Sequence, residues 1–182
     1  MKTYAETVKD TLFSLIHRIA EHPWLYSRNP ECDFTRDRKL TFEKMLTLLV
    51  SMGGDPIRDE LMDHFGCTPD MASVSAFVQQ RSKILPEALE FLFQQFTNIW
   101  ANGKLYNGYR LLAADGSDIQ FSADPNDKMS YFPGSNGQKH YSLLHLDAPY
   151  DLEHRTYLDD GVHKIKMSNE NGALVQMVER LN

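Results

Sequence analysis

The sequence is poor in the features that mark secreted, zinc-binding or membrane proteins. It has two cysteines in 182 residues, Cys32 and Cys67, which are too few for a disulfide framework and lack zinc-ligand spacing. The N-terminus has no apolar stretch of the kind found in signal peptides, and no apolar run approaches the length of a membrane span. We therefore expect a protein of the reducing cytoplasm that does not cross a membrane.

The chain also lacks the excess of positive charge that is common in dedicated nucleic-acid-binding proteins. Its formal net charge is -6 and its pI is about 5.6. Any contact with DNA must therefore come from a local group of basic side chains. There is no Walker-type phosphate loop and no nucleophile elbow. The seven histidines are scattered without zinc spacing, and we interpret them as structural or surface residues.

The chain does have ample material for a core, since 42% of its residues are hydrophobic and 24% are charged. Apolar residues recur at helical spacing in the first half and predict helices over 5–21, 41–52, 55–65, 68–83 and 86–101. Thr41 is a capping residue, and Asp55-Pro56 and Thr68-Pro69 are start signals of the cap-plus-proline kind. In the fourth helix, Val74, Phe77 and Val78 are expected to form the inner face.

The hydrophobic period changes in the second half. Residues 111–114 form a continuous apolar run, typical of a strand buried on both faces, and Asp115-Gly116-Ser117 predicts a turn at its end. Further strands are expected over 141–147 and 155–166, the latter interrupted near 159–161, and a helix from Asn169. A turn is expected at 149–151. The fold class is therefore α+β or α/β, with a helical domain over 1–106 and a mixed domain over 107–182.

Asp115 is the candidate catalytic and metal-binding residue. In two-metal phosphoryl transfer, carboxylates hold a pair of divalent ions, and Mg²⁺ prefers hard oxygen ligands. A carboxylate at the end of a rigid strand suits this task. An aspartate before a glycine is also an ordinary way to begin a turn, and the spacing leaves both interpretations open. Asp147 and Asp151 are expected to be turn residues first, and they would face Asp115 only if the two strands pair.

Two groups of polar residues in the helical half are candidates for DNA contact. The helix over 68–83 follows a short helix and a glycine-containing turn, which is the order of a helix-turn-helix motif. It offers side chains that can hydrogen-bond in a DNA groove: Ser73, Ser75, Gln79, Gln80, Arg81 and Lys83. The preceding loop carries Arg36, Arg38 and Lys39, which could contact phosphates. Both groups are equally compatible with the solvated surface of a helical bundle.

Taken together and in order, several segments resemble bacterial insertion-sequence transposases of the DDE type, whose catalytic domain is RNase H-like. The resemblance covers most of the chain. It rests on residues 40–43, 48–54, 74–81, 84–93, 111–118, 145–151, 157–159 and the Asn169-Glu170 pair. Pro149 departs from the pattern, because an apolar residue other than proline is expected there.

The resemblance implies a fold, a reaction and a site. The fold is an N-terminal helical domain followed by the first β-β-β-α part of an RNase H-like domain. The reaction is cutting and joining of double-stranded DNA at the terminal repeats of the element, with Mg²⁺ or Mn²⁺ as cofactor and a possible homo-oligomer. Asp115 would be the first acid of the triad and a metal ligand.

The resemblance also implies what is missing. Asp147, Asp151 and Glu170 do not match the motifs of the second aspartate and the glutamate. We therefore expect the front part of a transposase that is inactive alone and binds no metal tightly, with an unfinished sheet edge that lowers solubility. Two alternatives remain. One is a truncated DNA-binding regulator that inhibits transposition. The other is a helical interaction module that does not bind DNA, which the acidic charge favours.

Overall fold

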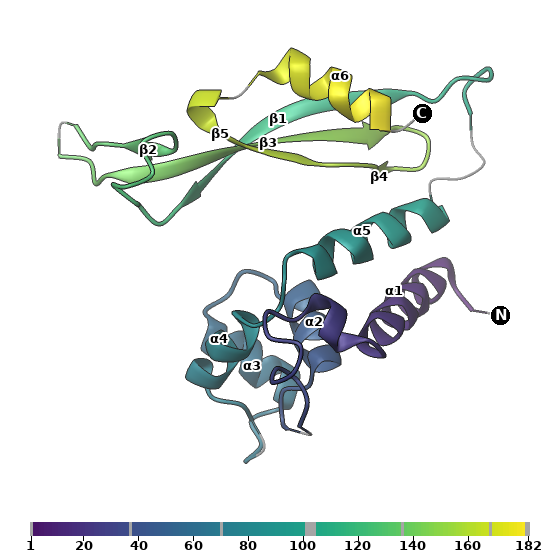
Figure 1. The fold of residues 1–182 in the computed structure, drawn as a ribbon. Coiled ribbons are helices and arrows are strands. Elements are labelled where there is room, and N and C mark those ends of the chain that lie inside the picture. The colour runs from purple at the N-terminus through teal and green to yellow at the C-terminus, as the bar shows by residue number, and fades with distance from the viewer. Residues whose placement is uncertain are drawn as a thin grey trace. The chain divides into compact units, whose positions relative to one another are not determined.

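The structure is a computed structural model that describes residues 2–36, 38–69, 71–100, 105–135, 137–167 and 169–180. The chain divides into two compact units, Met1–Phe96 and Thr97–Asn182. The described residues form six α-helices and a five-stranded antiparallel sheet, which confirms the α+β expectation (Figure 1). Within these ranges, no helix combines the length and the apolar character that crossing a membrane would require.

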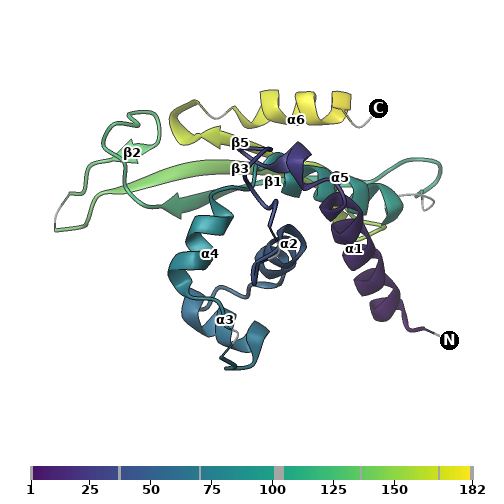
Figure 2. The same ribbon diagram turned by 60° about the horizontal axis from the view of Figure 1, so that its bottom comes forward.

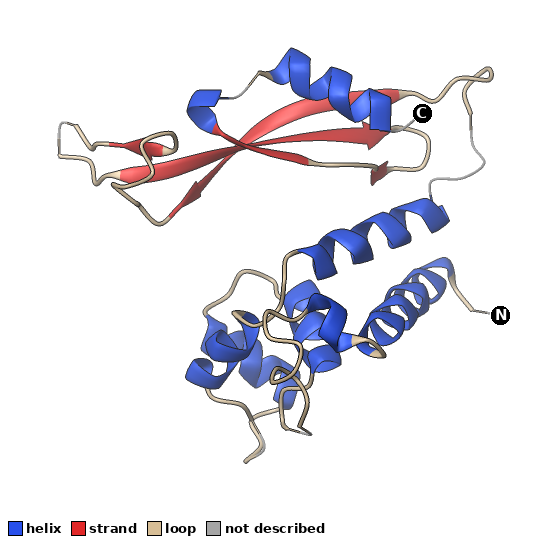
Figure 3. Ribbon diagram, viewed as in Figure 1, coloured by secondary structure: helices blue, strands red, loops and turns tan. Residues whose placement is uncertain are grey.

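The first unit is helical (Figure 3). Its elements are α1 (Tyr4–Ala20), the short 3-10 helix η1 (Pro23–Tyr26), α2 (Phe42–Ser51), α3 (Ile57–Phe65), α4 (Val74–Arg81) and α5 (Glu87–Trp100), whose last turn belongs to the second unit. Each of the five α-helices contributes to one hydrophobic core. Its most deeply buried side chains include Ile16, Met45, Leu46, Leu61 and Phe77.

The start of α2 is confirmed as predicted. The Thr41 hydroxyl accepts a hydrogen bond from the amide of Lys44 at 3.3 Å. A capping side chain satisfies an amide that has no partner inside the helix, which is why Thr41 marks the boundary. The next predicted start, at Asp55, is wrong. α3 begins at Ile57 with Pro56 as its cap residue, and no side-chain cap is present.

The carboxylate of Glu60 explains this shift. The amides of Gly53, Gly54 and Asp55 all donate to its Oε1 atom, at 2.7, 2.8 and 2.9 Å. A glutamate in the first turn of α3 thus reaches back and satisfies three successive amides before the helix. An anion next to a helix N-terminus is also favoured by the helix dipole. Glu60 therefore satisfies the amides at the start of α3, which is the role that the sequence pattern predicted for Asp55.

The predicted start of the following helix, at Thr68, is also wrong. α4 begins at Val74, and Ser73 is its cap, accepting from the amide of Ala76 at 3.2 Å. Only Phe77 of the three residues predicted to face inward is fully buried, while Val74 and Val78 are exposed. Phe77 is the one fully buried side chain of this eight-residue helix, and it holds α4 against the hydrophobic core.

The second unit is built on the long central strand β3 (Tyr141–Asp151). All four other strands pair with it in antiparallel orientation: β1 (Leu112–Phe121), β2 (Tyr131–Phe132), β4 (Thr156–Tyr157) and β5 (Gly161–Lys164). The 3-10 helix η2 (Ile165–Met167) leads into α6 (Glu170–Arg180), which packs against β3. Figures 1 and 2 show α6 along one face of the sheet.

The predicted turn at Asp115 is wrong, because β1 runs through residues 115–117 without interruption. An unbroken partner strand explains this, since Asp115, Gly116 and Ser117 lie opposite Ala148, Asp147 and Leu146. The expected burial on both faces is also wrong. Among the described residues β1 pairs with β3 alone, and most of its side chains are exposed.

The predicted turn at 149–151 is likewise part of a strand. Pro149 is fully buried in β3, and its carbonyl accepts a hydrogen bond from the amide of Leu158 at 3.0 Å. Proline removes one donor from a strand ladder but keeps its acceptor. The interruption expected in the third strand is confirmed, since β4 and β5 are separated by residues 158–160.

Candidate functional site

Seven of the nine residues predicted to contact DNA lie around two hollows in the helical unit. The larger has a volume of about 710 Å³ and is lined by Arg38, Lys39, Leu40, Met71, Ala72, Ser73, Ala76, Gln79 and Gln80. The smaller, about 320 Å³, is lined by Glu31, Cys32, Phe34, Thr35, Arg36, Arg38, Leu40, Gln80 and Lys83. Arg38, Leu40 and Gln80 line both hollows, which are therefore parts of one surface. We call it the Arg38–Gln80 surface.

Local structure explains why these residues meet. Leu40 is buried in the core and fixes the end of the basic loop, while Phe77 fixes α4. Lys39 reaches from the loop to the residues before α4, where its ammonium donates to the carbonyl of Pro69 at 3.2 Å. Residues some forty positions apart in sequence are thereby placed beside one another.

Basic side chains outnumber acidic ones among the described residues that line the surface, although the chain is acidic. Arg36, Arg38 and Lys39 are exposed. Lys83 differs, because its ammonium lies 3.7 Å from the carboxylate of the buried Asp33. Three basic side chains thus face solvent beside two glutamine amides, a combination able to contact phosphates and base edges.

The other predicted contacts have different positions. Ser75 and Arg81 do not line either hollow. The hydroxyl oxygen of Ser75 accepts a hydrogen bond from the side-chain amide of Gln79 at 3.5 Å. Ser73 lines the larger hollow, but its hydroxyl oxygen already caps α4. Asp37, within the basic loop, lies outside the described residues.

The predicted helix-turn-helix order is present with a longer connection. α3 ends at Phe65, and its C-cap residue Gly66 adopts the left-handed conformation with φ of 69°. α4 then begins only at Val74. The segment between them exceeds the three or four residues that are usual in this motif. α4 is therefore presented by a loop rather than by a tight turn.

Asp115 is exposed on β1, and its Oδ1 atom accepts a hydrogen bond from the amide of Gly116 at 2.9 Å. β1 and β3 do pair, but the register places Asp147 opposite Gly116 and Asp151 opposite Leu112. Because successive side chains of a strand point to opposite faces, both aspartates lie on the other face from Asp115. The pairing of β1 with β3 therefore brings neither Asp147 nor Asp151 to the side of Asp115.

The described residues do not fit a pair of divalent ions. None of their His, Cys, Asp and Glu side chains form a group of three or more that could hold a metal. Asp115 is flanked on its own face by Ala113 and Ser117 and lies opposite Ala148. One carboxylate supplies too few oxygen ligands for two Mg²⁺ or Mn²⁺ ions. We therefore derive no catalytic step through a metal at these residues.

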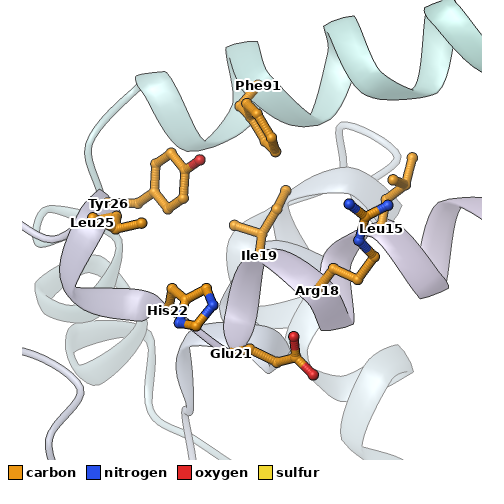
Figure 4. Close-up of a pocket in the computed structure, with 8 residues that line it drawn as sticks. All are labelled: Leu15, Arg18, Ile19, Glu21, His22, Leu25, Tyr26 and Phe91. Atoms are coloured by element: carbon orange, nitrogen blue, oxygen red, sulfur yellow. The ribbon is translucent and has the colours of Figure 1, made fainter.

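A third hollow, of about 290 Å³, contains none of the predicted site residues (Figure 4). It is lined by Leu15, Arg18, Ile19, Glu21, His22, Leu25, Tyr26 and Phe91, so aliphatic and aromatic side chains predominate. In Figure 4 Phe91 of α5 faces Ile19 of α1 across the hollow. No set of polar groups converges there, and we assign the hollow no chemical role.

Four ionisable side chains that the sequence did not predict as a site form a row on the sheet: Asp118, His145, Asp147 and His163. The histidines are scattered in the sequence, but the fold brings His145 and His163 onto one face of the sheet. The signal was the two-residue spacing of His145 and Asp147, which places both on one face of a strand.

Comparison with known protein families, curated proteins and solved structures found no match for the chain. The function is therefore inferred from the chain's own residues and their geometry.

Proposed function

We propose that the helical unit binds double-stranded DNA through the Arg38–Gln80 surface, and that the chain is the front part of a DDE-type transposase. One observation carries the first part. Seven of nine residues selected from sequence as DNA contacts, drawn from a loop and a helix, line the same surface. A surface selected only for solubility has no need to gather the basic loop and the glutamines of α4.

The order of elements in the second unit supports the transposase assignment. Three antiparallel strands, β1, β3 and β5, are followed by α6, and this order is compatible with the opening part of an RNase H-like domain. In the described residues β1 has a partner on one edge only. A further strand pairing with that edge would complete a larger sheet and would remove the exposed edge that we expect to lower solubility.

In this proposal Asp115 is one acid of the catalytic set. Its position on a regular strand holds the carboxylate rigidly and leaves it exposed. The described residues provide no second carboxylate beside it, so we expect this chain alone to bind DNA without cutting it. The isolation of Asp115 also favours the alternative of a binding-only regulator that occupies the element ends and inhibits transposition.

A salt series tests DNA binding. Fluorescence anisotropy with a labelled mixed-sequence duplex should show binding at about 50 mM salt that weakens steeply as salt rises, because phosphate contacts release counterions. Arg38→Ala should weaken binding and reduce the slope of log affinity against log salt by about one. Arg18→Ala, which removes the same charge from the hollow of Figure 4, is the matched control and should change neither.

Failure to bind duplex DNA at about 50 mM salt, in a protein with its helical circular-dichroism signal intact, would contradict the proposal. That outcome would support the third possibility, a helical interaction module that does not bind DNA. Equal losses in Arg38→Ala and Arg18→Ala would show that bulk charge acts rather than the proposed surface.

A further inference from the structure

Four ionisable side chains form a row across three strands of the sheet. Asp118 of β1 lies 2.8 Å from Nδ1 of His145, through its Oδ1 atom. The Nε2 atom of the same ring lies 3.4 Å from Oδ1 of Asp147. The other oxygen of Asp147, Oδ2, lies 3.7 Å from Nε2 of His163 on β5. We call these residues the His145 row.

Strand register creates this row. His145 of β3 lies opposite both Asp118 and His163, and directly opposite residues share a face of the sheet. Asp147 lies two residues further along β3, on the same face. Acidic and imidazole groups therefore alternate across the sheet, from β1 to β5.

Two glycines provide the space for the rings. Gly116 and Gly161 both lie opposite Asp147, on either side of it. A Cβ atom added at Gly116 would lie 2.5 Å from Nε2 of His145, and one at Gly161 would lie 3.0 Å from Nε2 of His163. A distance of 2.5 Å, as at Gly116, is shorter than the contacts that real Cβ atoms make. The absence of a side chain at Gly116 thus lets the His145 ring lie against β1.

The middle of the row is removed from water. The side chains of His145 and Asp147 are 8% and 7% exposed, while those of Asp118 and His163 are 49% and 35% exposed. Oδ2 of Asp147 has no hydrogen-bond partner among the described residues. A buried carboxylate without full hydrogen bonding is costly unless a positive charge lies close to it.

The ring of His145 faces a carboxylate oxygen at each nitrogen. A neutral imidazole has one N–H and one lone pair. In that form one nitrogen would present its lone pair to a carboxylate, which is repulsive. The imidazolium has two N–H groups. One can donate to Asp118 at 2.8 Å, and the other is in ion-pair contact with Asp147 at 3.4 Å, without a hydrogen bond. The geometry therefore favours the charged ring between two negative charges.

Two charged side chains on the elements next to β3 have carboxylate partners outside the row. α6 packs against β3 and buries the uncharged Ala173 and Met177. Its Arg180 pairs with Asp159 at 2.7 Å. On β5, Lys164 lies opposite Leu144 on the other face of the sheet and pairs with Asp127 at 3.0 Å. Within the row itself, His163 is the second group that can bring positive charge to Asp147.

We propose that His145 is a proton-dependent lock that holds β1 to β3. With its proton, the ring joins Asp118 of β1 to Asp147 of β3. Loss of the proton leaves a neutral ring with a single N–H, so the contact between His145 and Asp118 of β1 loses its ionic part and the pairing of the two strands is weakened. The stabilisation is present while the ring is charged and is lost as the pH rises through the midpoint of the ring's titration in the folded protein. This inference does not depend on DNA binding.

Proton NMR of the histidine rings in the full chain tests the lock. We expect the midpoint of the His145 titration to lie above that of an ordinary histidine. Asp147→Asn should move the midpoint of the His145 titration toward acid by about one pH unit or more. Asp118→Asn should move it in the same direction, and this half-exposed position is the safer variant if Asp147→Asn does not fold.

Asp115→Asn is the matched control, since it removes a carboxylate from the same strand on the opposite face of the sheet, and it should leave the midpoint unchanged. A second readout is amide hydrogen exchange of residues 117–119, corrected for its intrinsic pH dependence. Protection in β1 should fall as the His145 ring loses its proton. Either of two results would overturn the proposal. One is a His145 ring that is neutral at about pH 7, and the other is a titration midpoint that is the same in Asp147→Asn, Asp118→Asn and Asp115→Asn.

Discussion

Replacing Glu60 tests how the helical unit joins α2 to α3. Its carboxylate oxygen accepts from the amides of Gly53, Gly54 and Asp55 at 2.7–2.9 Å. Hydrogen bonds to a charged group contribute about 1.5–3 kcal/mol each when the partners are shielded from water. Here the three amides lie at exposed residues and can rehydrate, so the loss is closer to that of a helix cap, about 0.5–2 kcal/mol. We expect Glu60→Ala to cost about 2 kcal/mol, at the upper end of that range.

Asp55→Ala is the matched control, because Asp55 was the cap expected from sequence. Its side chain does not cap α3, and its amide remains available to Glu60, so we expect a cost below about 0.5 kcal/mol. Urea unfolding followed by circular dichroism at 222 nm reports mainly on the helical unit. With a slope of about 1–3 kcal/mol per molar urea, Glu60→Ala should lower the midpoint by roughly 1 M. A larger loss in Asp55→Ala than in Glu60→Ala would refute this account of the α2–α3 connection.

Three further predictions concern other parts of the structure. Phe77→Ala should destabilise the helical unit by about 3–5 kcal/mol because Phe77 is fully buried, while exposed Val78→Ala should cost below about 1 kcal/mol in the same urea assay. Burial acts to raise the pKa of Asp151, but hydrogen bonds from His154 and from a backbone amide outweigh it and hold this pKa below its usual range. Asp151 therefore contributes stability above the unfolded-state pKa that is lost as the pH falls through the lower folded-state value, and Asp151→Asn should flatten the acid limb of a stability–pH curve. Gly116→Ala should disturb the His145 ring signal, because the added Cβ would lie 2.5 Å from Nε2.

The helix positions were predictable from sequence where the determining contact is local. Thr41 caps α2 through an amide three residues away, and this pattern is visible in the sequence. The start of α3 was not predictable in the same way. Glu60 reaches back to amides five to seven residues earlier, and no short pattern distinguishes it from an ordinary surface glutamate.

The strands were located from sequence, but their environment was not. An apolar run at 111–114 is compatible with burial on both faces, and only the pairing shows that β1 lies beside a single partner in the described residues. The position of Asp147 depends on register, and a shift of one residue would have put it on the face of Asp115. Sequence spacing alone does not determine on which face of the sheet Asp147 lies relative to Asp115.

The candidate DNA surface was largely predictable because it combines two short segments. Gln79 and Gln80 are adjacent on α4, and the basic residues are adjacent in the loop, so each group only had to be placed beside the other. Arg81 was included because it shares the helix, but neighbouring residues on a helix point in different directions. Thr68-Pro69 predicts a helix start at Thr68, but Ser73 caps the helix instead, so the length of the loop before α4 was not predictable from this pattern.

Mapping the surface that DNA covers tests the central claim most directly. Hydrogen exchange of the full chain should be compared with and without a saturating mixed-sequence duplex. We predict that protection on DNA binding is concentrated in residues 38–40 and 73–83, which carry the Arg38–Gln80 surface. The segment around Arg18 and His22 should remain unchanged. Protection of that segment without protection of α4, or no change anywhere in the helical unit, would contradict the account.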